Sequence, residues 1–168
     1  MSAERIIILD HSQIEKKIWR ISHEICERNY REKELILVGI KGTGAIICDL
    51  ISNRLAEIST MRISQLLMSL DKEKPGASPI LLEPDEPNLR SRHVILIDDV
   101  LNSGKTMMHA ACYLLSRNPA SLSTVAMIDR LHRKFPVKAD YVGITLSTSI
   151  QEHVIVNQVN GKFTAYLE

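Results

Sequence analysis

The chain has 168 residues, the length of about one domain, and a chain of this size can bury a core without disulfides or structural metals. Its 21 lysines and arginines nearly balance its 20 aspartates and glutamates, so the formal net charge is only +1. This balance excludes a strong positive field over the whole surface, although a local basic face for nucleic acid stays open.

No segment is long and apolar enough to cross a membrane, and the apolar run near the N-terminus is too short for a signal peptide. The three cysteines, Cys26, Cys48 and Cys112, have no metal-like spacing and lie among apolar neighbours, which predicts buried free thiols. Free thiols are typical of the cytosol. We therefore expect one domain over residues 1–168, in a cytoplasmic protein without a membrane partner.

The first helix is predicted by a cap and an apolar stripe. Ser12 begins a capping-box pattern, Ser12-Gln13-Ile14-Glu15, and isoleucines then recur on one helical face as far as Asn29. Trp19 and His23 are expected to help this helix pack. The apolar face consists of Ile14, Ile18, Ile21 and Ile25.

A second unit begins with the apolar run Glu34 to Ile40, which predicts a strand. The strand leads into the turn Gly39-Ile40-Lys41-Gly42-Thr43-Gly44 and then into a helix with Ile46, Ile47, Leu50 and Ile51 on its apolar face. The turn is neither a P-loop nor a dinucleotide fingerprint, because no further glycine falls in the required place. A tight strand-to-helix turn and an anion-binding loop are both open here.

Residues 61–70 predict a strand of moderate strength, and the following stretch, 71–92, collects prolines, lysines and acids without a regular pattern. We expect no regular element there. Irregular stretches of this length inside a domain are usually lids, binding loops or insertions. We interpret this one as a lid, with an inert insertion as the alternative.

The most informative stretch runs from Val94 to Thr106. Four branched apolar residues, Val94 to Ile97, predict a strand buried on both faces, and Asp98 and Asp99 end it at the carboxyl edge, where open α/β sheets bind ligands. A turn of small residues follows, and a helical pattern runs from Lys105 to Arg117. The free amides and dipole at the start of that helix predict a phosphate site.

A P-loop NTPase is the rival interpretation of Gly104-Lys105-Thr106. That motif needs a glycine five residues before Gly104, and the chain has Asp99 there. Two acids beside a phosphate loop favour a ligand with neighbouring hydroxyls and a phosphate. A ribose 5-phosphate fits that description.

The rest of the chain predicts strands at 123–128 and 139–146, a charged segment at 129–134, and a hairpin at 154–167 that turns at Asn160-Gly161. Alternating strands and helices predict an α/β fold with a mainly parallel central sheet flanked by helices. The lid and the C-terminal hairpin should form a small hood over the carboxyl edge.

The stretch from Val94 to Thr106 resembles the phosphoribosyl-pyrophosphate (PRPP) motif of type I phosphoribosyltransferases. Similar patterns occur at residues 20–25, 36–41, 128–130 and 139–143, and the whole is most similar to the branch of bifunctional uracil phosphoribosyltransferases that also regulate pyrimidine operons by attenuation. The resemblance implies the type I phosphoribosyltransferase fold, with a mobile loop near 68–92. It also implies magnesium-dependent transfer of the phosphoribosyl group to uracil or another pyrimidine or purine base, with release of pyrophosphate, as in pyrimidine salvage.

Homodimers are common in the resembled family. An alternative function is a non-catalytic or bifunctional regulator that senses nucleotides and binds RNA. Its basic face would include Arg130, His132, Arg133 and Lys134.

The resemblance also assigns site residues. Asp98 and Asp99 would be catalytic and hold the ribose hydroxyls, with magnesium carried mainly on PRPP oxygens near them rather than by protein ligands alone. The PRPP-binding set is Asp98, Asp99, Val100, Leu101, Asn102, Ser103, Gly104, Lys105 and Thr106. The pyrophosphate loop is Ile40, Lys41, Gly42 and Thr43, and the nucleobase would contact Ile128, Asp129, Arg130, Tyr141 and Val142.

Two departures from the most similar branch concern pyrophosphate. Its pyrophosphate loop has an arginine that Gly42-Thr43-Gly44 lacks, and its mobile loop has a tyrosine-arginine-acid-acid cluster that residues 67–72 lack. Lys41, Lys72 and Lys74 are the cations that could compensate, although lysine is a point charge without the guanidinium fork. PRPP binding is therefore predicted more strongly than catalysis.

Overall fold

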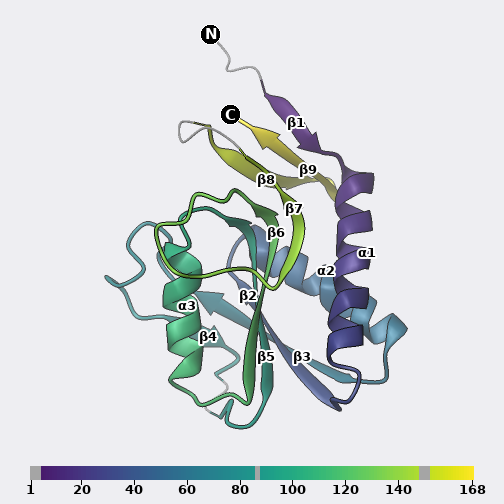
Figure 1. The fold of residues 1–168 in the computed structure, drawn as a ribbon, viewed down its shortest axis with the longest axis vertical. Helices are drawn as coiled ribbons and strands as arrows, with labels where there is room; N and C mark the ends of the chain where they lie inside the picture. The colour runs from purple at the N-terminus through teal and green to yellow at the C-terminus, as the bar shows by residue number, and fades with distance from the viewer. Residues whose placement is uncertain (1–4, 86–87, 148–151) are drawn as a thin grey trace.

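The structure is a computed structural model that describes residues 5–85, 88–147 and 152–168. These residues contain three helices and nine strands, and the strands form two sheets. Figure 1 shows the order of the elements. The helices are α1 (His11–Arg28), α2 (Thr43–Ile58) and α3 (Lys105–Leu115). The strands are β1 (Ile6–Leu9), β2 (Glu34–Ile40), β3 (Arg62–Ser69), β4 (Leu81–Glu83), β5 (His93–Leu101), β6 (Ser121–Asp129), β7 (Tyr141–Thr145), β8 (Val154–Val159) and β9 (Lys162–Leu167).

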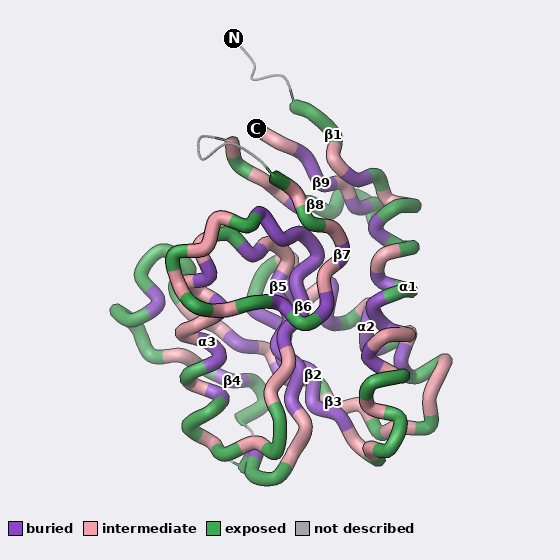
Figure 2. The backbone as a smooth tube through the Cα atoms, viewed as in Figure 1, coloured by how far each residue is buried: buried purple, intermediate pink, exposed green. Residues whose placement is uncertain are grey.

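The larger sheet has the order β4-β3-β2-β5-β6-β7. All its neighbouring pairs are parallel except β3 and β4. Continuous apolar runs form its central strands because parallel strands are covered on both faces. Figure 2 shows these strands as the buried centre of the molecule. The predicted α/β fold with a mainly parallel sheet is confirmed.

Helices cover both faces of this sheet, as Figure 1 shows. The isoleucines of α1 and the apolar face of α2 pack on one face, in a core that also contains Leu37 and Ile95. Met107, Ala110 and Leu114 of α3 pack on the other, against Ile36 and Leu96. The parallel strands thereby end at one exposed edge between two helical layers.

The start of α1 differs from the prediction. Asp10, and not Ser12, is the N-cap: its side chain accepts the amide N–H of Gln13, and the Gln13 side chain accepts the amide of Asp10. The capping box is therefore two residues earlier, because an aspartate caps at least as well as a serine. The Trp19 ring contacts the His23 ring at a tilt of 44° but is 50% exposed, so it adds little to the core.

Two further expectations need correction. The stretch 71–92 contains a regular element, the short strand β4, which pairs antiparallel with β3 from Leu67↔Glu83 to Ser69↔Leu81. Of the three cysteines, only Cys48 is buried, and Cys112 is exposed on α3. The sequence pattern marked the apolar neighbours of Cys112 but not its place on the outer side of the helix.

The second sheet has the order β1-β9-β8, and we call it the hood. The predicted hairpin forms β8 and β9 and turns at Asn160 and Gly161, both of which have positive φ. Sequence analysis did not predict β1, which pairs antiparallel with β9. The hood lies above the carboxyl ends of the parallel strands in Figure 1, and Val154 of β8 lines the same cavity as residues 98–107. Among the described residues, no helix is both long and apolar enough to cross a bilayer.

Candidate active site

Asp98 and Asp99 lie inside β5 and do not end it, contrary to the prediction. Strand β2 pairs with β5 only as far as Gly39↔Ile97, whereas β6 accompanies β5 to Leu101↔Asp129. Asp98 and Asp99 therefore follow directly after the last residue of β5 that pairs with β2. Asp98 is only 3% exposed, and its Oδ1 accepts the Asp99 amide N–H at 3.0 Å.

Lys72 neutralises this pair from the segment that follows β3. Its Nζ lies 2.9 Å from Oδ1 of Asp98 and 3.5 Å from Oδ1 of Asp99. Burial raises the pKa of Asp98 to about 7, and the charge of Asp99 adds to the rise while Lys72 opposes it. Burial alone would lower the pKa of Lys72, but the two carboxylates raise it above its usual value. Asp98 and Lys72 therefore both lose their protons at a higher pH than they would in an unfolded chain.

The loop that follows the acids is held in place by residues 134–137. Gly104 has φ +86, and a Cβ there would lie 2.6 Å from Cγ1 of Val137. The Ser103 carbonyl accepts the amides of Lys134 and Phe135 at 2.9 and 3.1 Å. Helix α3 starts here with no side-chain cap hydrogen bond. The Lys105 amide donates to the Ser103 hydroxyl at 3.3 Å, and the amides of Thr106 and Met107 that follow it are available to an anion.

One cavity of about 330 Å³ joins the acids to this helix start. All nine residues of the predicted PRPP-binding set line it, together with Lys72, Met107 and Val154. Its volume lies at the lower end of the range for small-molecule sites. Val154 could not be predicted because nothing local in the sequence shows that β8 reaches the cavity, and Lys72 was predicted only as a cation for pyrophosphate.

The predicted pyrophosphate loop lies beside the acids but does not line the cavity. A Cβ on Gly44 would be 3.0 Å from Asp98 Oδ1, so α2 starts against the acid pair. The Lys41 side chain is exposed, and its amide donates to the Met68 carbonyl at 2.8 Å. The Thr43 hydroxyl donates to the Val156 carbonyl in the hood at 3.1 Å. Ile40 is fully buried.

The predicted base contacts at the end of β6 are only partly accessible. Arg130 is 4% exposed and donates to Asn102 Oδ1 at 2.9 Å and to the Glu152 carbonyl at 2.6 Å, so it links the phosphate loop to the hood. Asp129 forms an ion pair with Arg133. The Ile128 side chain is buried in the core, which leaves only its backbone for a ligand.

Tyr141 and Val142 begin β7, and Val142 is level with Asp98 across the sheet, because Val142 pairs with Ala126 and Ala126 pairs with Asp98. Tyr141 pairs with Val125 at the start of β7, whereas Asp129 pairs with Thr145 at its end. Tyr141 is 2% exposed, with the Arg28 guanidinium 4.7 Å from its ring centroid. The Tyr141 side chain is thus buried and Val142 is half-buried, and their base contact stays a prediction.

The predicted basic face at 130–134 is reduced by internal contacts. Arg130 is buried and Arg133 is paired with Asp129, whereas the Lys134 side chain is exposed. A face that includes Arg130 is therefore wrong. The buried position follows from the hydrogen bonds that Arg130 makes across the loop.

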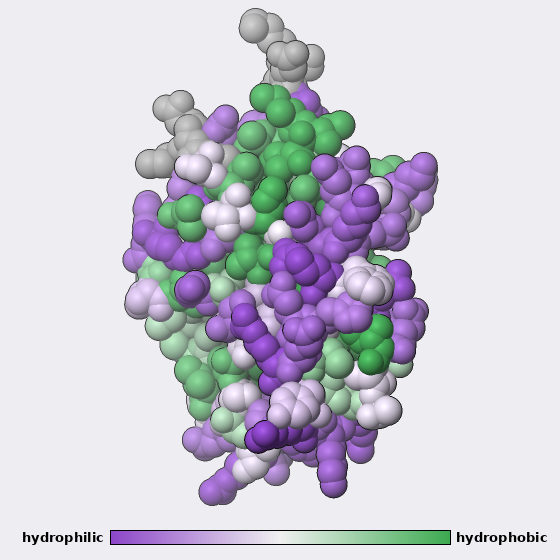
Figure 3. Space-filling view, turned by 45° about the vertical axis from the view of Figure 1, so that its right-hand side comes forward, coloured by the Kyte–Doolittle hydropathy of each residue, from purple (hydrophilic) through white to green (hydrophobic). Residues whose placement is uncertain are grey.

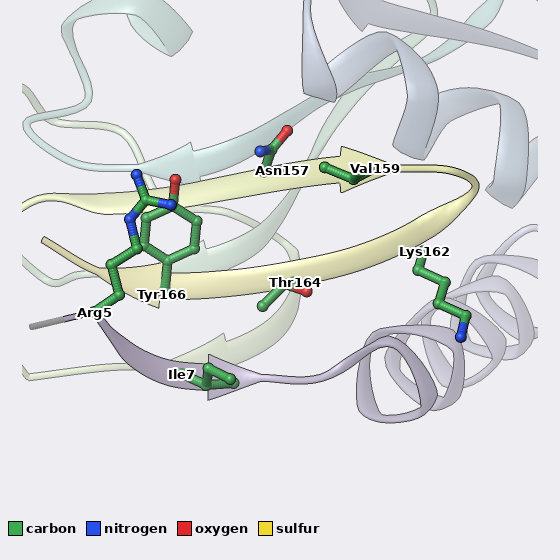
Figure 4. Close-up of a pocket in the computed structure, with 7 residues that line it drawn as sticks. All are labelled: Arg5, Ile7, Asn157, Val159, Lys162, Thr164 and Tyr166. Carbon is green, nitrogen blue, oxygen red and sulfur yellow. The ribbon is translucent and has the colours of Figure 1, made fainter.

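A second cavity, of about 350 Å³, lies on the hood and shares no residue with the first. Figure 4 shows side chains from all three hood strands around it, with Arg5 beside the Tyr166 ring at 4.8 Å from the centroid. Figure 3 shows hydrophobic residues gathered on the surface next to the N-terminus, and Ile6, Ile7 and Val159 of the hood are all at least 58% exposed. This surface is separate from the acidic site.

Comparisons with known proteins agree with this geometry. The family model of the phosphoribosyl transferase domain matches residues 6–160. Proteins called "Bifunctional protein PyrR" from Bacillus cereus and Bacillus anthracis are 33% identical, over 92% of this chain and 91% of theirs. A hypoxanthine phosphoribosyltransferase of Trypanosoma cruzi has a similar fold, with a TM-score of 0.79 at 17% identity over 95% of this chain and 94% of that one. A structure of that enzyme with the product IMP has a TM-score of 0.77 at 19% identity over 92% and 81% of the two chains.

The predicted resemblance is thus confirmed by a family match that spans most of the chain and by relatives of similar length. The chain therefore belongs to the phosphoribosyl transferase domain family, and its activity is the transfer of a phosphoribosyl group to a nucleobase.

Proposed function

We propose that the chain binds PRPP in the cavity formed by residues 98–106 and transfers its phosphoribosyl group with release of pyrophosphate. The observation that carries this proposal is that the acid pair, of which Asp98 is buried, shares one cavity of about 330 Å³ with the start of α3, which has no side-chain cap. Carboxylates accept hydrogen bonds from sugar hydroxyls, and free helix amides bind phosphate. Both ends of a ribose 5-phosphate find partners there.

Asp98 and Asp99 act as acceptors for the ribose hydroxyls. The reaction develops positive charge on the ribose ring, and a carboxylate beside that ring stabilises it. Little covalent chemistry is required of the protein, so most of the rate comes from holding the base and sugar in line. The buried environment of Asp98 strengthens its electrostatic effect on bound ligand.

The 5-phosphate is held by the amides that begin α3 and by the hydroxyls of Ser103 and Thr106. Gly104 is the residue that permits this loop, because its φ of +86 is rarely adopted by other residues. Ser103 also accepts the Lys105 amide through its hydroxyl at 3.3 Å, which organises the turn. The pyrophosphate would lie toward Gly42, Thr43 and the exposed Lys41.

The acid pair fits a magnesium ion only if the substrate supplies most of its ligands. In the described parts of the chain, no three His, Cys, Asp or Glu side chains gather into a metal-binding group. Magnesium retains several waters and is usually held by one or two carboxylates plus phosphate oxygens. Bound with the donor, it would neutralise diphosphate charge. Asp98 and Asp99 would orient that complex from the protein side.

The base is uracil or another pyrimidine or purine, and its edge would meet the backbone at Ile128 and Asp129. These residues end β6 beside Leu101, which lines the cavity. We further propose a cytoplasmic homodimer with one domain per chain. The base is identified by measuring pyrophosphate release with PRPP and magnesium supplied. The bases to screen are uracil, hypoxanthine, guanine, xanthine, adenine and orotate.

The site itself is tested by the double variant Asp98→Asn with Asp99→Asn. It should lose PRPP binding by at least about 100-fold, because two charge-assisted acceptors are lost at about 1.5–3 kcal/mol each. Titration calorimetry with magnesium and PRPP measures the affinity, and circular dichroism checks the fold. Asp49→Asn, which changes an exposed acid on α2, is the matched control. Unchanged affinity in the double variant would refute the assigned site.

A second function, RNA binding, is the alternative, and the relatives that match over most of their length are called bifunctional. The exposed cations next to the site, Lys134 and Lys138, are where it would begin. Binding of a pyrimidine-operon leader transcript that weakens with salt and responds to a nucleotide supports a regulator. Pyrophosphate release that requires a base, without such binding, supports the enzyme alone.

A further inference from the structure

Lys72 is the one charged side chain from outside residues 98–106 that lines the acidic cavity, within the ranges that the structure describes. It extends from an exposed turn after β3 in which the Asp71 carboxylate accepts the amides of Glu73 and Lys74. Pro75 in the same turn is buried, and the Cβ position of Gly76 is 3.5 Å from the His109 ring. The turn therefore lies between the acid pair and the side of α3.

The Lys72 ammonium occupies one of the carboxylate oxygens that a sugar hydroxyl could use. Oδ1 of Asp98 already accepts the Asp99 amide at 3.0 Å and the Lys72 ammonium at 2.9 Å. A carboxylate oxygen has two lone-pair directions, so this oxygen has no free acceptor direction. Lys72 also lies within 3.5 Å of Asp99 Oδ1. A hydroxyl can bond to Oδ1 of Asp98 only after Lys72 has moved away.

The ion pair also ties the turn to the acid pair. Lys72 has a 43% exposed side chain, whereas the Asp98 side chain is 5% exposed, so the buried partner gains more from the contact. A buried carboxylate without a counter-charge is costly, which favours Lys72 in the free protein. The donor must therefore compensate for breaking this pair.

We propose that Lys72 is a tethered competitor for the ribose subsite, which occupies the acid pair in the free protein and leaves it when a ribose 5-phosphate group binds. Its departure releases the turn at 71–78, so sugar binding opens this segment. This inference rests on the proposed function and adds a control of donor affinity to it. Lys72 acts as a positioning residue, because it governs access to Asp98 and Asp99.

The test uses ribose 5-phosphate, which lacks the diphosphate that could attract a released lysine. Lys72→Met should bind it about tenfold more tightly than Lys74→Met, which removes the same charge from the same turn without a contact to the acid pair. Lys72→Arg retains the charge and should bind like the wild type. Calorimetry at low salt and pH 8 gives the affinities. Equal or weaker binding by Lys72→Met than by Lys74→Met overturns the proposal.

Hydrogen exchange of residues 71–78 gives a second measurement. Ribose 5-phosphate should raise exchange there several-fold in the wild type and leave it unchanged in Lys72→Met. Without ligand, Lys72→Met should exchange faster than Lys74→Met, and equal rates would overturn the proposal even if no protein binds the sugar. Absence of binding to ribose 5-phosphate and PRPP in all variants, with the ligand-free difference present, would instead refute the proposed function.

Discussion

Asp98 combines a buried carboxylate with a cation, and the two make its charge dependent on pH. Burial raises its pKa to about 7. The folded state therefore binds this proton more tightly than the unfolded state, whose carboxyl has a value near 3.8. As pH rises from about 4 to 7, the folded state loses stability relative to a chain without this group. Lys72, with a raised pKa, stays charged across that window.

Asp98→Asn should remove this pH dependence. The stability of the wild type minus that of Asp98→Asn should fall by a few kcal/mol between pH 5 and pH 8, because only the wild type must ionise a buried acid. PRPP affinity of the wild type should rise over the same window, since the ionised carboxylate is the better acceptor. Urea unfolding and calorimetry at each pH measure both. Parallel stability curves for the two proteins would show that Asp98 titrates normally.

At the scale of elements, the start of α3 is held by the segment that follows β6. Gly104 lies under residues 135–137, which return after β6 and are tied to the Ser103 carbonyl. The loop conformation is therefore fixed by both its own glycine and a segment about thirty residues later in the chain. A phosphate site built in this way is preorganised before the ligand arrives.

Gly104→Ala should lower stability by about 1–3 kcal/mol and weaken PRPP binding at least tenfold, because the new Cβ meets Val137 and the positive φ is strained. Gly161→Ala is the matched control: it has φ +77 in the hood turn, but its Cβ would meet nothing within 4 Å. It should show the cost of φ alone, with PRPP affinity unchanged. Equal effects in the two variants would mean that the contact with Val137 has no role.

At the scale of the whole molecule, the hood shares a core with the helices below it. Leu9, Val156 and Phe163 of the hood lie in the same buried cluster as Ile14 and Ile47. The Phe163 ring also stacks on His11 at a centroid distance of 6.0 Å. The hood and the parallel sheet should therefore unfold together.

Phe163→Ala tests this coupling and should lower the free energy of unfolding by about 3–5 kcal/mol, as expected for a buried aromatic residue. Val159→Ala, at a position 60% exposed, should change it by less than about 0.5 kcal/mol. Circular dichroism and Trp19 fluorescence in urea should report one common transition. Separate transitions would show that the hood is an independent unit.

The local part of the site could be predicted from the sequence, and the part set by register could not. Residues 98–106 are contiguous, so their order alone brings the acids to a helix start. The distance of Tyr141 from the acids could not be predicted, because it depends on how β7 aligns with β6. Asp98 was placed after β5 because the lengths of the neighbouring strands decide where pairing stops. Strand β1 was missed because its only partner among the described strands, β9, is at the other end of the sequence.

The pairing of β1 with β9 also affects protein synthesis. Ile6 pairs with Leu167, so β1 leaves the ribosome long before the strand that pairs with it. The six-stranded sheet can be completed once β7 has emerged, whereas β1 would remain an uncovered apolar edge, a hazard for association between nascent chains. A translation stop between β7 and β9 would therefore leave a nearly finished enzyme that chaperones have reason to hold.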